Sequence, residues 1–289
     1  MTASATPSPS PAAAAGTVSI GGEHEVNRLG FGAMRITGPG IWGPPRDHDE
    51  SLRVLRRAVD LGVNFIDTAD SYGPDVSEEL IAEALAPYPE GLVIATKGGL
   101  VRPGAGRWDP DGRPEHLREA LEGSLRRLRT EQVTLYQFHR PDPAVPLEES
   151  VGELARLRDE GKIRHVGLSN VSTGQLARAR AIVPIVSVQN HYNLDDRASD
   201  EVVAAAEHDG FAFIPYAPVG GHRPGGGRAL AQVAARHGVS PVQVALAWQL
   251  ARSPQMLPIP GTSSVAHLEE NVAAAALVLD SDDLSRLAA

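Results

Sequence analysis

Residues Asn64 to Gly73 read NFIDTADSYG, and the sequence that follows repeats the design of this stretch. The apolar run Val63 to Ile66 predicts a short buried strand, which ends at Asp67, a carboxylate that is costly to bury without a partner. The next strand, LVIATKGG from Leu92 to Gly99, is also apolar and carries a single cation, Lys97, near its end. Near-continuous apolar strands of this kind indicate a parallel sheet that is buried on both faces.

Lys97 is unusual in this composition, because the chain has 27 basic residues and only two of them, Lys97 and Lys162, are lysines. Unlike arginine, a lysine can shift its pKa and can act as a compact charge beside a group that gains or loses a proton. A purely structural ion pair between Asp67 and Lys97 is the alternative interpretation, and these two residues alone do not decide between the two.

Strand and helix patterns alternate along most of the chain. A β-hairpin is expected from Thr17 around the Gly21-Gly22 turn, followed by eight units in which a strand precedes a helix. The expected strands end near Met34, Asp67, Lys97, His139, Asn170, Asn190, Pro218 and Ser264. The expected helices cover residues 49–61, 77–86, 114–128, 147–160, 173–181, 199–209, 228–237, 241–251 and 265–276.

Eight strand-helix units in roughly 250 residues predict an α/β fold, the (β/α)8 TIM barrel, here with an N-terminal β-hairpin. The active site of such a barrel lies at the C-terminal ends of its strands, where the polar residues of this sequence gather. A doubly wound sheet is the competing architecture, but no strand is followed by the G-x-G-x-x-G motif of its nucleotide-binding members.

Composition excludes several classes of site. The chain has no cysteine, which excludes disulfides, zinc-thiolate sites and thiol nucleophiles. A net charge of -9 without a basic cluster argues against nucleic-acid binding, and the apolar runs are too short to span a bilayer. There is no H-E-x-x-H motif, and His24 and His48 lie among surface charges, so we expect no metal site.

Residues 1–16 are rich in Ala, Ser and Pro and predict a disordered tail. They contain neither the charged start nor the long apolar core of a secretory signal, so a cytoplasmic protein is expected. Residues 17–289 are expected to form one domain, the barrel.

Tyr72 lies five residues beyond Asp67, on a loop over the expected barrel mouth, where its phenol can face Lys97 and His139. Since a free tyrosine titrates near ~10, a tyrosine that donates a proton at neutral pH needs a cation to stabilise its phenolate. Lys97, held by Asp67, is suited to that task. His139 is suited to hydrogen-bond a substrate carbonyl oxygen or to relay a proton to Tyr72.

Three motifs, FIDTADSYG, IATKGG and YQFHRPD, resemble those of the aldo-keto reductase family, and the resemblance extends from about Thr17 to the C-terminus. It implies that Asp67, Tyr72, Lys97 and His139 are the catalytic tetrad of that family. It further implies that Tyr72 is the general acid and that a nicotinamide cofactor supplies a hydride to an aldehyde or ketone.

The same resemblance implies residues that hold the cofactor. GLSN and SVQNHYN imply that Ser169, Asn170 and Gln189 hydrogen-bond the nicotinamide carboxamide, and FIPYAP implies that the Tyr216 ring stacks on the nicotinamide. The segment IPGTSSVAHLEEN resembles the one that binds the adenosine end. The cofactor contacts implied there are Gly261, Thr262, Ser263, His267, Glu270 and Asn271.

Simpler interpretations remain open for several of these residues. Tyr216 can be barrel packing, and Thr262 and Ser263 can be ordinary caps of a helix whose N-terminus also suits a phosphate. Gly261 and His267 stand where many NADPH-dependent members carry lysine and arginine. Usage in the family nevertheless makes NADPH the expected cofactor, and the lack of a cation at these two positions makes NADH the alternative.

The first loop, GAMRITGPGIWGPPRD, together with IPGTSSVAHL, resembles the bacterial pyridoxal reductase branch of the family. This narrower resemblance implies reduction of pyridoxal to pyridoxine, with Trp42 lining the substrate pocket. Trp108, in the loop from Leu100 to Pro114, either shapes the pocket or covers the rim of the barrel. Because a barrel alone does not determine function, two other classes stay open. They are a lyase that forms a Schiff base on Lys97 and a non-catalytic nicotinamide-binding subunit. A small carbonyl substrate is the expected partner, while the oligomeric state is left open.

Overall fold

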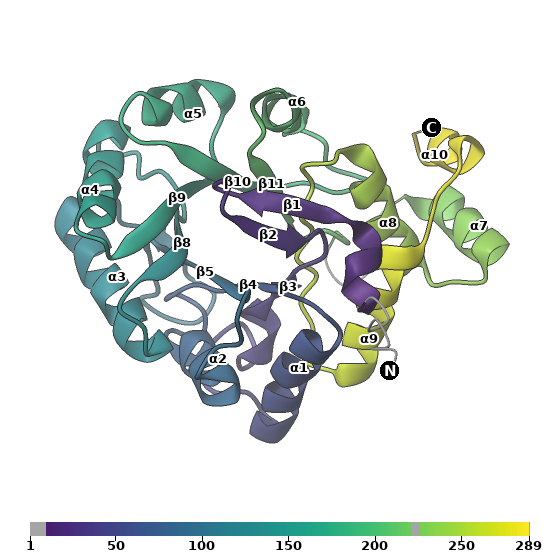
Figure 1. Ribbon diagram of the computed structural model, residues 1–289, viewed down its shortest axis with the longest axis horizontal. Helices are drawn as coiled ribbons and strands as arrows, with labels where there is room; N and C mark the ends of the chain where they lie inside the picture. The colour runs from purple at the N-terminus through teal and green to yellow at the C-terminus, as the bar shows by residue number, and fades with distance from the viewer. Residues whose placement is uncertain (1–9, 221–225, 289) are drawn as a thin grey trace, which may run out of the picture.

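The computed structural model describes residues 10–220 and 226–288 (Figure 1). Its strands are β1 (Thr17–Ile20), β2 (His24–Asn27), β3 (Phe31–Gly32), β4 (Phe65–Asp67), β5 (Val93–Gly98), β6 (Leu100–Val101), β7 (Asp109–Pro110), β8 (Val133–Phe138), β9 (Ile163–Ser169), β10 (Ile185–His191) and β11 (Ala212–Tyr216). Its helices are α1 (His48–Asp60), α2 (Val76–Leu85), α3 (Pro114–Leu128), α4 (Leu147–Asp159), α5 (Thr173–Arg180), α6 (Asp200–Asp209), α7 (Gly227–His237), α8 (Pro241–Arg252), α9 (Val265–Ala273) and α10 (Ser281–Ala288). Three short 3-10 helices, η1 (Pro11–Ala15), η2 (Ala33–Ile36) and η3 (Ala274–Ala276), complete the list.

A parallel sheet of seven strands, in the order β11-β10-β9-β8-β5-β4-β3, curls around the centre of the molecule. The segment Gln255 to Pro258 closes it. On one side Phe213 of β11 donates to the Gln255 carbonyl and accepts from Leu257, both at 2.9 Å, and on the other side Gly30 donates to the Pro258 carbonyl at 2.9 Å. This segment occupies the place of the eighth strand, so the predicted (β/α)8 barrel is confirmed.

The helices begin where the sequence supplies caps. Asp47 accepts a hydrogen bond from the Glu50 backbone at the start of α1, and the Ser172 and Ser240 side chains form capping boxes at the starts of α5 and α8. Each helix of the outer ring turns an apolar face toward the sheet, as α1 does with Leu52 and Leu55, which are buried. The predicted helices are therefore present, with ends that differ by a few residues.

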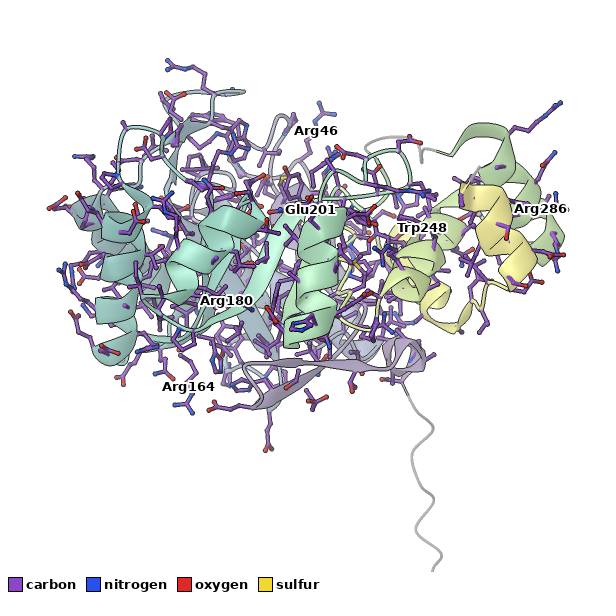
Figure 2. All side chains as sticks on the ribbon, turned by 90° about the horizontal axis from the view of Figure 1, so that it is seen from above. Arg46, Arg164, Arg180, Glu201, Trp248 and Arg286 are labelled. Atoms are coloured by element: carbon purple, nitrogen blue, oxygen red, sulfur yellow. The ribbon has the colours of Figure 1, made fainter. Side chains whose placement is uncertain are left out.

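The hairpin of β1 and β2 lies across the opening of the barrel (Figure 1), as the view down the barrel shows. Val18, Ile20 and Val26 of the hairpin pack with Phe65 and Val93, which stand at the starts of barrel strands. In the side view of Figure 2, Arg164 near the start of β9 lies at the edge of the molecule along which the hairpin runs. The hairpin thus plugs the end of the barrel opposite to the C-terminal ends of the strands.

The predicted disordered tail is wrong for residues 10–16, and residues 1–9 lie outside the described residues. Residues Pro11 to Ala15 form η1, which contacts η3 and α9, and Ala12 is fully buried. The Ala12 backbone N–H donates to the Leu61 carbonyl at 3.0 Å. Small alanine side chains let this segment pack closely at little cost in side-chain entropy, which composition alone does not reveal. The folded domain therefore includes residues before Thr17.

No helix in residues 10–220 and 226–288 has both the length and the apolar character that a membrane crossing requires.

Candidate active site

Polar side chains of three neighbouring strands meet at the C-terminal end of the barrel. β4 ends at Asp67, β5 carries Lys97 next to its end, and His139 follows β8, while β4 pairs with β5 and β5 with β8. The Lys97 ammonium lies 2.6 Å from Asp67 Oδ2, 2.8 Å from the Thr68 carbonyl and 3.2 Å from the Tyr72 hydroxyl. The structure therefore brings the four predicted catalytic residues into one cluster.

The second oxygen of Asp67 is held by two amides. Gln137 donates to Asp67 Oδ1 at 3.0 Å and Gln189 donates to it at 2.8 Å. Asp67 is 1% exposed and Lys97 is fully buried, so both charges need these partners to offset their lost hydration. Gln137 was not among the site residues expected from the sequence. Its signal was a single amide in the otherwise apolar second half of the β8 strand.

The Tyr72 side chain is almost fully buried, and its ring packs edge to face against His139, with ring centroids 5.9 Å apart. Burial raises the pKa of Tyr72, while the Lys97 ammonium acts in the opposite direction. The expectation from the sequence included only the effect of the cation on the Tyr72 pKa. With a raised pKa the phenol keeps its proton at neutral pH, and Lys97 remains in place to stabilise the phenolate once that proton is given up.

His139 is neutral in this environment. Burial, followed by the charges of Lys97 and Arg140, lowers the pKa of His139 well below its ordinary value. Its Nδ1 lies 3.4 Å from the Ser71 hydroxyl, and its ring faces Tyr72. A neutral imidazole can donate one hydrogen bond to a carbonyl oxygen without adding a second cation beside Lys97.

Lys97 keeps its proton. Burial alone would lower the pKa of Lys97, but the Asp67 carboxylate and the Tyr72 phenol raise it above its ordinary value. An amine must be neutral to attack a carbonyl carbon, so this environment disfavours a Schiff base on Lys97.

The four residues expected to hold the nicotinamide lie at the ends of the next strands. Asn170, with a left-handed φ of 58°, follows Ser169 at the end of β9, and its amide donates to Ser169 Oγ at 2.9 Å and to the His139 carbonyl at 3.0 Å. The Tyr216 hydroxyl donates to Asn170 Oδ1 at 2.8 Å. The Asn170 backbone N–H donates to the Gln189 carbonyl at 3.0 Å, and Gln189 binds Asp67, so one hydrogen-bonded chain links the expected cofactor side with the catalytic cluster.

This donor set suits a carboxamide attached to a flat ring. The Asn170 Oδ1 and Gln189 Oε1 atoms are acceptors for an amide N–H, and the Ser169 hydroxyl is a donor for an amide oxygen. The ring of Tyr216 is half-buried and offers an aromatic face beside them.

The segment expected to hold the adenosine end follows the eighth strand and leads into α9. Thr262 Oγ1 accepts from the Ser264 backbone N–H at 3.1 Å, a turn bond just before α9, while the N-cap residue Ser264 makes no side-chain capping bond. The Val265 backbone N–H, at the start of α9, donates to the Glu50 carboxylate of α1 at 3.0 Å. Gly261 packs on Gly32, since a Cβ on Gly261 would lie 2.5 Å from the Gly32 carbonyl oxygen. These contacts show that part of the segment also helps to hold the fold together.

The other expected contacts of this segment differ in exposure. Ser263 and His267 are exposed, Glu270 is half-buried and Asn271 is buried. The neighbouring Glu269, whose charge would oppose a phosphate, pairs with Arg57 of α1 at 2.8 Å. Its charge is therefore offset by a cation, but both side chains are nearly half-exposed, so the offset is modest.

Two tryptophans stand near the catalytic cluster, and an arginine that was not expected from the sequence connects them. Trp108 packs edge to face with Tyr72, with ring centroids 6.3 Å apart. The Arg102 guanidinium lies 3.6 Å from the Trp108 ring centroid and 5.4 Å from that of Trp42. Arg102 also donates to the carbonyls of Ile41 and Ser71, each at 3.0 Å. It therefore joins three loops at the barrel mouth, a role that no spacing in the sequence indicates.

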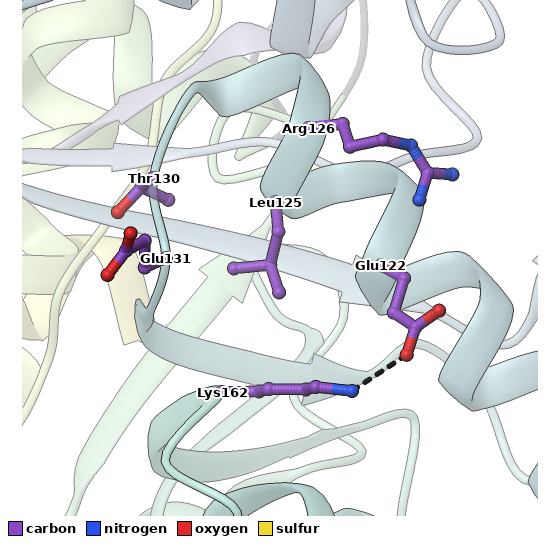
Figure 3. Close-up of a pocket in the computed structure, with 6 residues that line it drawn as sticks. All are labelled: Glu122, Leu125, Arg126, Thr130, Glu131 and Lys162. Atoms are coloured by element: carbon purple, nitrogen blue, oxygen red, sulfur yellow. Dashed lines mark hydrogen bonds and ion pairs between the residues drawn. The ribbon is translucent and has the colours of Figure 1, made fainter.

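A separate hollow lies on the outer surface beside α3, and Lys162 crosses its lower edge (Figure 3). Its lining consists of Glu122, Leu125, Arg126, Thr130, Glu131 and Lys162. The Lys162 ammonium is already paired with Glu122 at 2.7 Å. The hollow contains none of the expected site residues and does not compete with the barrel mouth as the candidate site.

Comparisons with known proteins agree with this geometry. The model of the Aldo/keto reductase family matches residues 28–225 and 226–289. An uncharacterized oxidoreductase of Schizosaccharomyces pombe is 49% identical over 99% of this chain and 94% of its own length. The pyridoxine 4-dehydrogenase of Escherichia coli is 47% identical over 92% of this chain and 95% of its own length. Among solved structures, an aldo-keto reductase from Klebsiella pneumoniae in complex with NADPH superposes with a TM-score of 0.79 at 28% identity, covering 94% of this chain and 93% of that one.

Proposed function

Because this chain belongs to the aldo/keto reductase family, we propose that it is a nicotinamide-dependent oxidoreductase that reduces a carbonyl group to an alcohol, with Tyr72 as the proton donor. The observation that carries the proposal is the contact of the Tyr72 hydroxyl with the Lys97 ammonium at 3.2 Å, inside a buried cluster at the barrel mouth. Barrel enzymes carry out their chemistry at this end of the strands.

Each residue of the cluster has a distinct task. Tyr72 holds the proton that the alkoxide oxygen receives, because its pKa is raised by burial. Lys97 stabilises the phenolate that proton transfer leaves behind, and Asp67 keeps Lys97 charged and in position. Neutral His139 donates a hydrogen bond to the carbonyl oxygen and orients it toward Tyr72.

NADPH is the cofactor we propose, and when bound it would supply the hydride for reduction of the carbonyl carbon. Support comes from the NADPH complex of the Klebsiella pneumoniae aldo-keto reductase. Ser169, Asn170, Gln189 and Tyr216 would hold the nicotinamide by the donor set described above. At the adenosine end, the residues proposed to bind are Gly261, Thr262, Ser263, His267, Glu270 and Asn271. NADH remains the alternative, because no lysine or arginine stands at Gly261 or His267.

Pyridoxal is the substrate we propose, and pyridoxine is the product. The 47% identity to the pyridoxine 4-dehydrogenase of Escherichia coli supports this choice. Trp42 and Trp108 would form aromatic walls for a flat pyridine ring, with Arg102 holding the two loops together. A substrate with a small aromatic ring and an exposed aldehyde fits this description.

The test is the absorbance of reduced nicotinamide in the presence of purified protein, with NADPH and NADH in parallel and with pyridoxal beside a simple aromatic aldehyde. We expect oxidation of NADPH with pyridoxal. Oxidation only with the simple aldehyde would retain the reductase and remove the pyridoxal assignment. Cofactor binding without turnover of either aldehyde would favour a non-catalytic nicotinamide-binding subunit. Borohydride trapping with a carbonyl substrate should leave Lys97 unlabelled, since a label there would indicate a Schiff-base lyase.

A further inference from the structure

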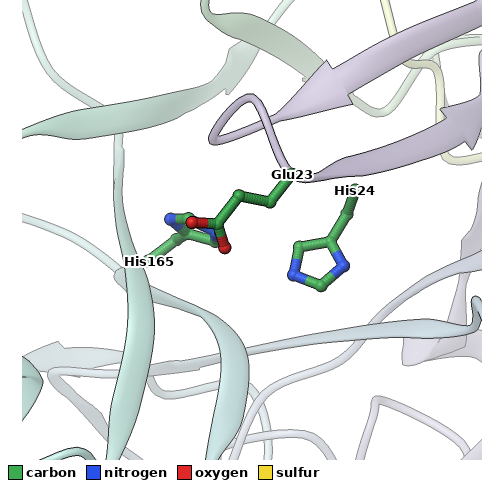
Figure 4. Close-up of side chains that lie close together, drawn as sticks. All are labelled: Glu23, His24 and His165. Carbon is green, nitrogen blue, oxygen red and sulfur yellow. The ribbon is translucent and has the colours of Figure 1, made fainter.

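Three metal-ligating side chains converge at the hairpin end of the barrel, away from the catalytic cluster (Figure 4). Glu23 and His24 belong to the turn and start of β2, and His165 lies near the start of β9. One ligand atom from each of the three lies within 4.8 Å of the other two. We propose that Glu23, His24 and His165 bind a divalent transition-metal ion, with Zn²⁺ as the best match, and that this ion clamps the hairpin to the barrel.

The burial and hydrogen bonding of the His165 side chain give the strongest support for this site. Its side chain is 11% exposed, and its ring packs so closely on the hairpin that a Cβ on Gly21 would lie 2.2 Å from Cε1. Its Nε2 is buried and has no hydrogen-bond partner among the residues that the structure describes, although Glu23 Oε2 lies 3.4 Å away. A buried ring nitrogen without a partner is costly, so this atom is available to a ligand.

The second imidazole stands next to the first. The rings of His24 and His165 are arranged edge to face, with centroids 5.7 Å apart. His24 is half-buried and Glu23 is exposed, so both side chains have room to turn toward an ion. His24 was expected to be a solvated surface residue, because nothing in the sequence connects it with His165.

Two imidazoles and one carboxylate form a donor set that zinc uses in proteins, with a fourth position left for water. Zinc binds such ligands at about 2.0–2.2 Å, so tetrahedral ligand atoms lie closer together than the 4.8 Å limit seen here. Binding would therefore draw the Glu23 and His24 side chains inward. Other late first-row divalent ions would bind the same atoms, in the usual affinity order.

Arg164 competes with the ion. Its guanidinium binds both oxygens of Glu23, at 2.7 and 2.8 Å. The pair is about half-exposed, so it contributes little to stability and can open, but its positive charge opposes a metal ion. Removing Arg164 should therefore strengthen metal binding, which an unrelated surface site would not show.

The proposed site is independent of the reaction. His165 precedes Ser169 by four residues on the same strand, a distance of about 13 Å along β9. An ion that binds only the folded protein raises the midpoint of thermal unfolding. We expect the ion to stabilise the fold while leaving carbonyl reduction unchanged.

The test is calorimetric titration of untagged, chelator-treated full-length protein with ZnCl₂ at pH 7.5, followed by thermal unfolding with and without zinc. We expect one zinc ion per chain and a higher unfolding midpoint. His24→Gln and His165→Gln should each weaken binding by roughly tenfold or more, and Arg164→Gln should strengthen it several-fold. His208→Gln, which changes an exposed histidine of α6, is the matched control and should bind zinc as the parent protein does.

Circular dichroism of each zinc-free variant shows whether that variant folds. A variant that does not fold is replaced by Glu23→Gln, which removes a carboxylate from an exposed position. Zinc affinity that is the same in the parent, His24→Gln and His165→Gln proteins would overturn the proposal. The same conclusion would follow if Arg164→Gln weakened binding or if the parent protein bound no zinc. None of these readouts depends on turnover, so they remain separate from the test of the proposed reductase.

Discussion

The Tyr72 hydroxyl has one polar partner in the catalytic cluster, the Lys97 ammonium at 3.2 Å. Asp67 binds that ammonium through one carboxylate oxygen and accepts hydrogen bonds from Gln137 and Gln189 through the other. Removal of the Tyr72 hydroxyl should therefore affect the protein differently from removal of the Asp67 or Lys97 charge. Loss of the hydroxyl removes the proton donor and little else, whereas loss of one buried charge leaves the other without its partner.

Tyr72→Phe should lower the rate of carbonyl reduction on the order of 10²–10⁴-fold, because general acid catalysis is lost. Binding of NADPH should change little, since the aromatic ring and its packing against His139 and Trp108 remain. Turnover and cofactor binding, followed by protein fluorescence, are the two measurements. A variant that reduces pyridoxal at the parent rate would remove Tyr72 from its assigned role.

Lys97→Met should destabilise the protein by about 3–5 kcal/mol, because the buried Asp67 carboxylate then lacks its cation. The double variant Asp67→Asn with Lys97→Met should recover much of that free energy of unfolding, although it should remain inactive. Urea unfolding of both proteins gives the comparison. If the single variant proved as stable as the parent, the buried pair would not be coupled as its 2.6 Å distance indicates.

His139 should make the fold sensitive to mild acid. Burial, with Lys97 and Arg140, lowers the pKa of His139 in the folded protein, so the unfolded chain binds a proton there at higher pH than the folded protein does. The free energy of unfolding should therefore decrease as the pH falls below about 6.5, the ordinary value in an unfolded chain. His139→Asn should lose less stability than the parent between pH 7.5 and 5 in urea unfolding, and an equal loss would contradict this.

Among the elements, the loops over the barrel mouth depend most on one another. β6 and β7 form a short antiparallel pair in the loop after β5, and this pair presents Arg102 and Trp108. The loop after β3 contributes Trp42, which forms a backbone bridge with Gly73 beyond Tyr72. The wall of the proposed substrate pocket is thus assembled from three loops, and Arg102 is the side chain that they share.

Arg102→Ala should raise KM for pyridoxal by roughly tenfold and change kcat less, because the tryptophan walls lose their common anchor while Tyr72 and Lys97 stay in place. Arg102→Lys should restore little, because a lysine cannot stack a planar group on Trp108 or reach the same carbonyls. Arg107→Ala, in the same loop and exposed, is the matched control. A parent-like KM in Arg102→Ala would separate this arginine from the substrate pocket.

At the scale of the whole molecule, the ends of the barrel have separate tasks. The C-terminal end of the sheet holds the proposed catalytic cluster, and the hairpin plugs the other end with Val18, Ile20 and Val26. The segment before the hairpin also belongs to the fold, because η1 contacts η3 and α9 near the C-terminus.

Ala12→Glu should destabilise the protein by roughly 2 kcal/mol, because it introduces a carboxylate at a fully buried position. Ala14→Glu, an exposed position in the same turn, is the matched control and should have little effect. Thermal unfolding of the two variants makes the comparison. Equal stability of the two variants would indicate that residues 10–16 belong to the disordered tail that composition predicts.

Two kinds of signal let the sequence predict much of this protein. Strand and helix periodicity arises from burial of one face of each element, so it is local and predicts the barrel and most element bounds. Asp67, Tyr72 and Lys97 lie in short motifs at strand ends, and a barrel places all strand ends of one polarity together. The cluster was therefore predictable, whereas the raised pKa of Tyr72 was not, because burial depends on the packed neighbours.

The sequence by itself therefore determined the barrel, the hairpin and the four residues at the mouth of the barrel. Tertiary structure alone decided the contacts between segments that are distant in the chain. Gln189 binds Asp67, Arg102 joins the loop of Trp42, Ala12 packs beside Leu61, and His165 meets Glu23. Each of these contacts forms only when closure of the barrel brings distant residues together, and a single contact of this kind leaves no periodic pattern in the sequence.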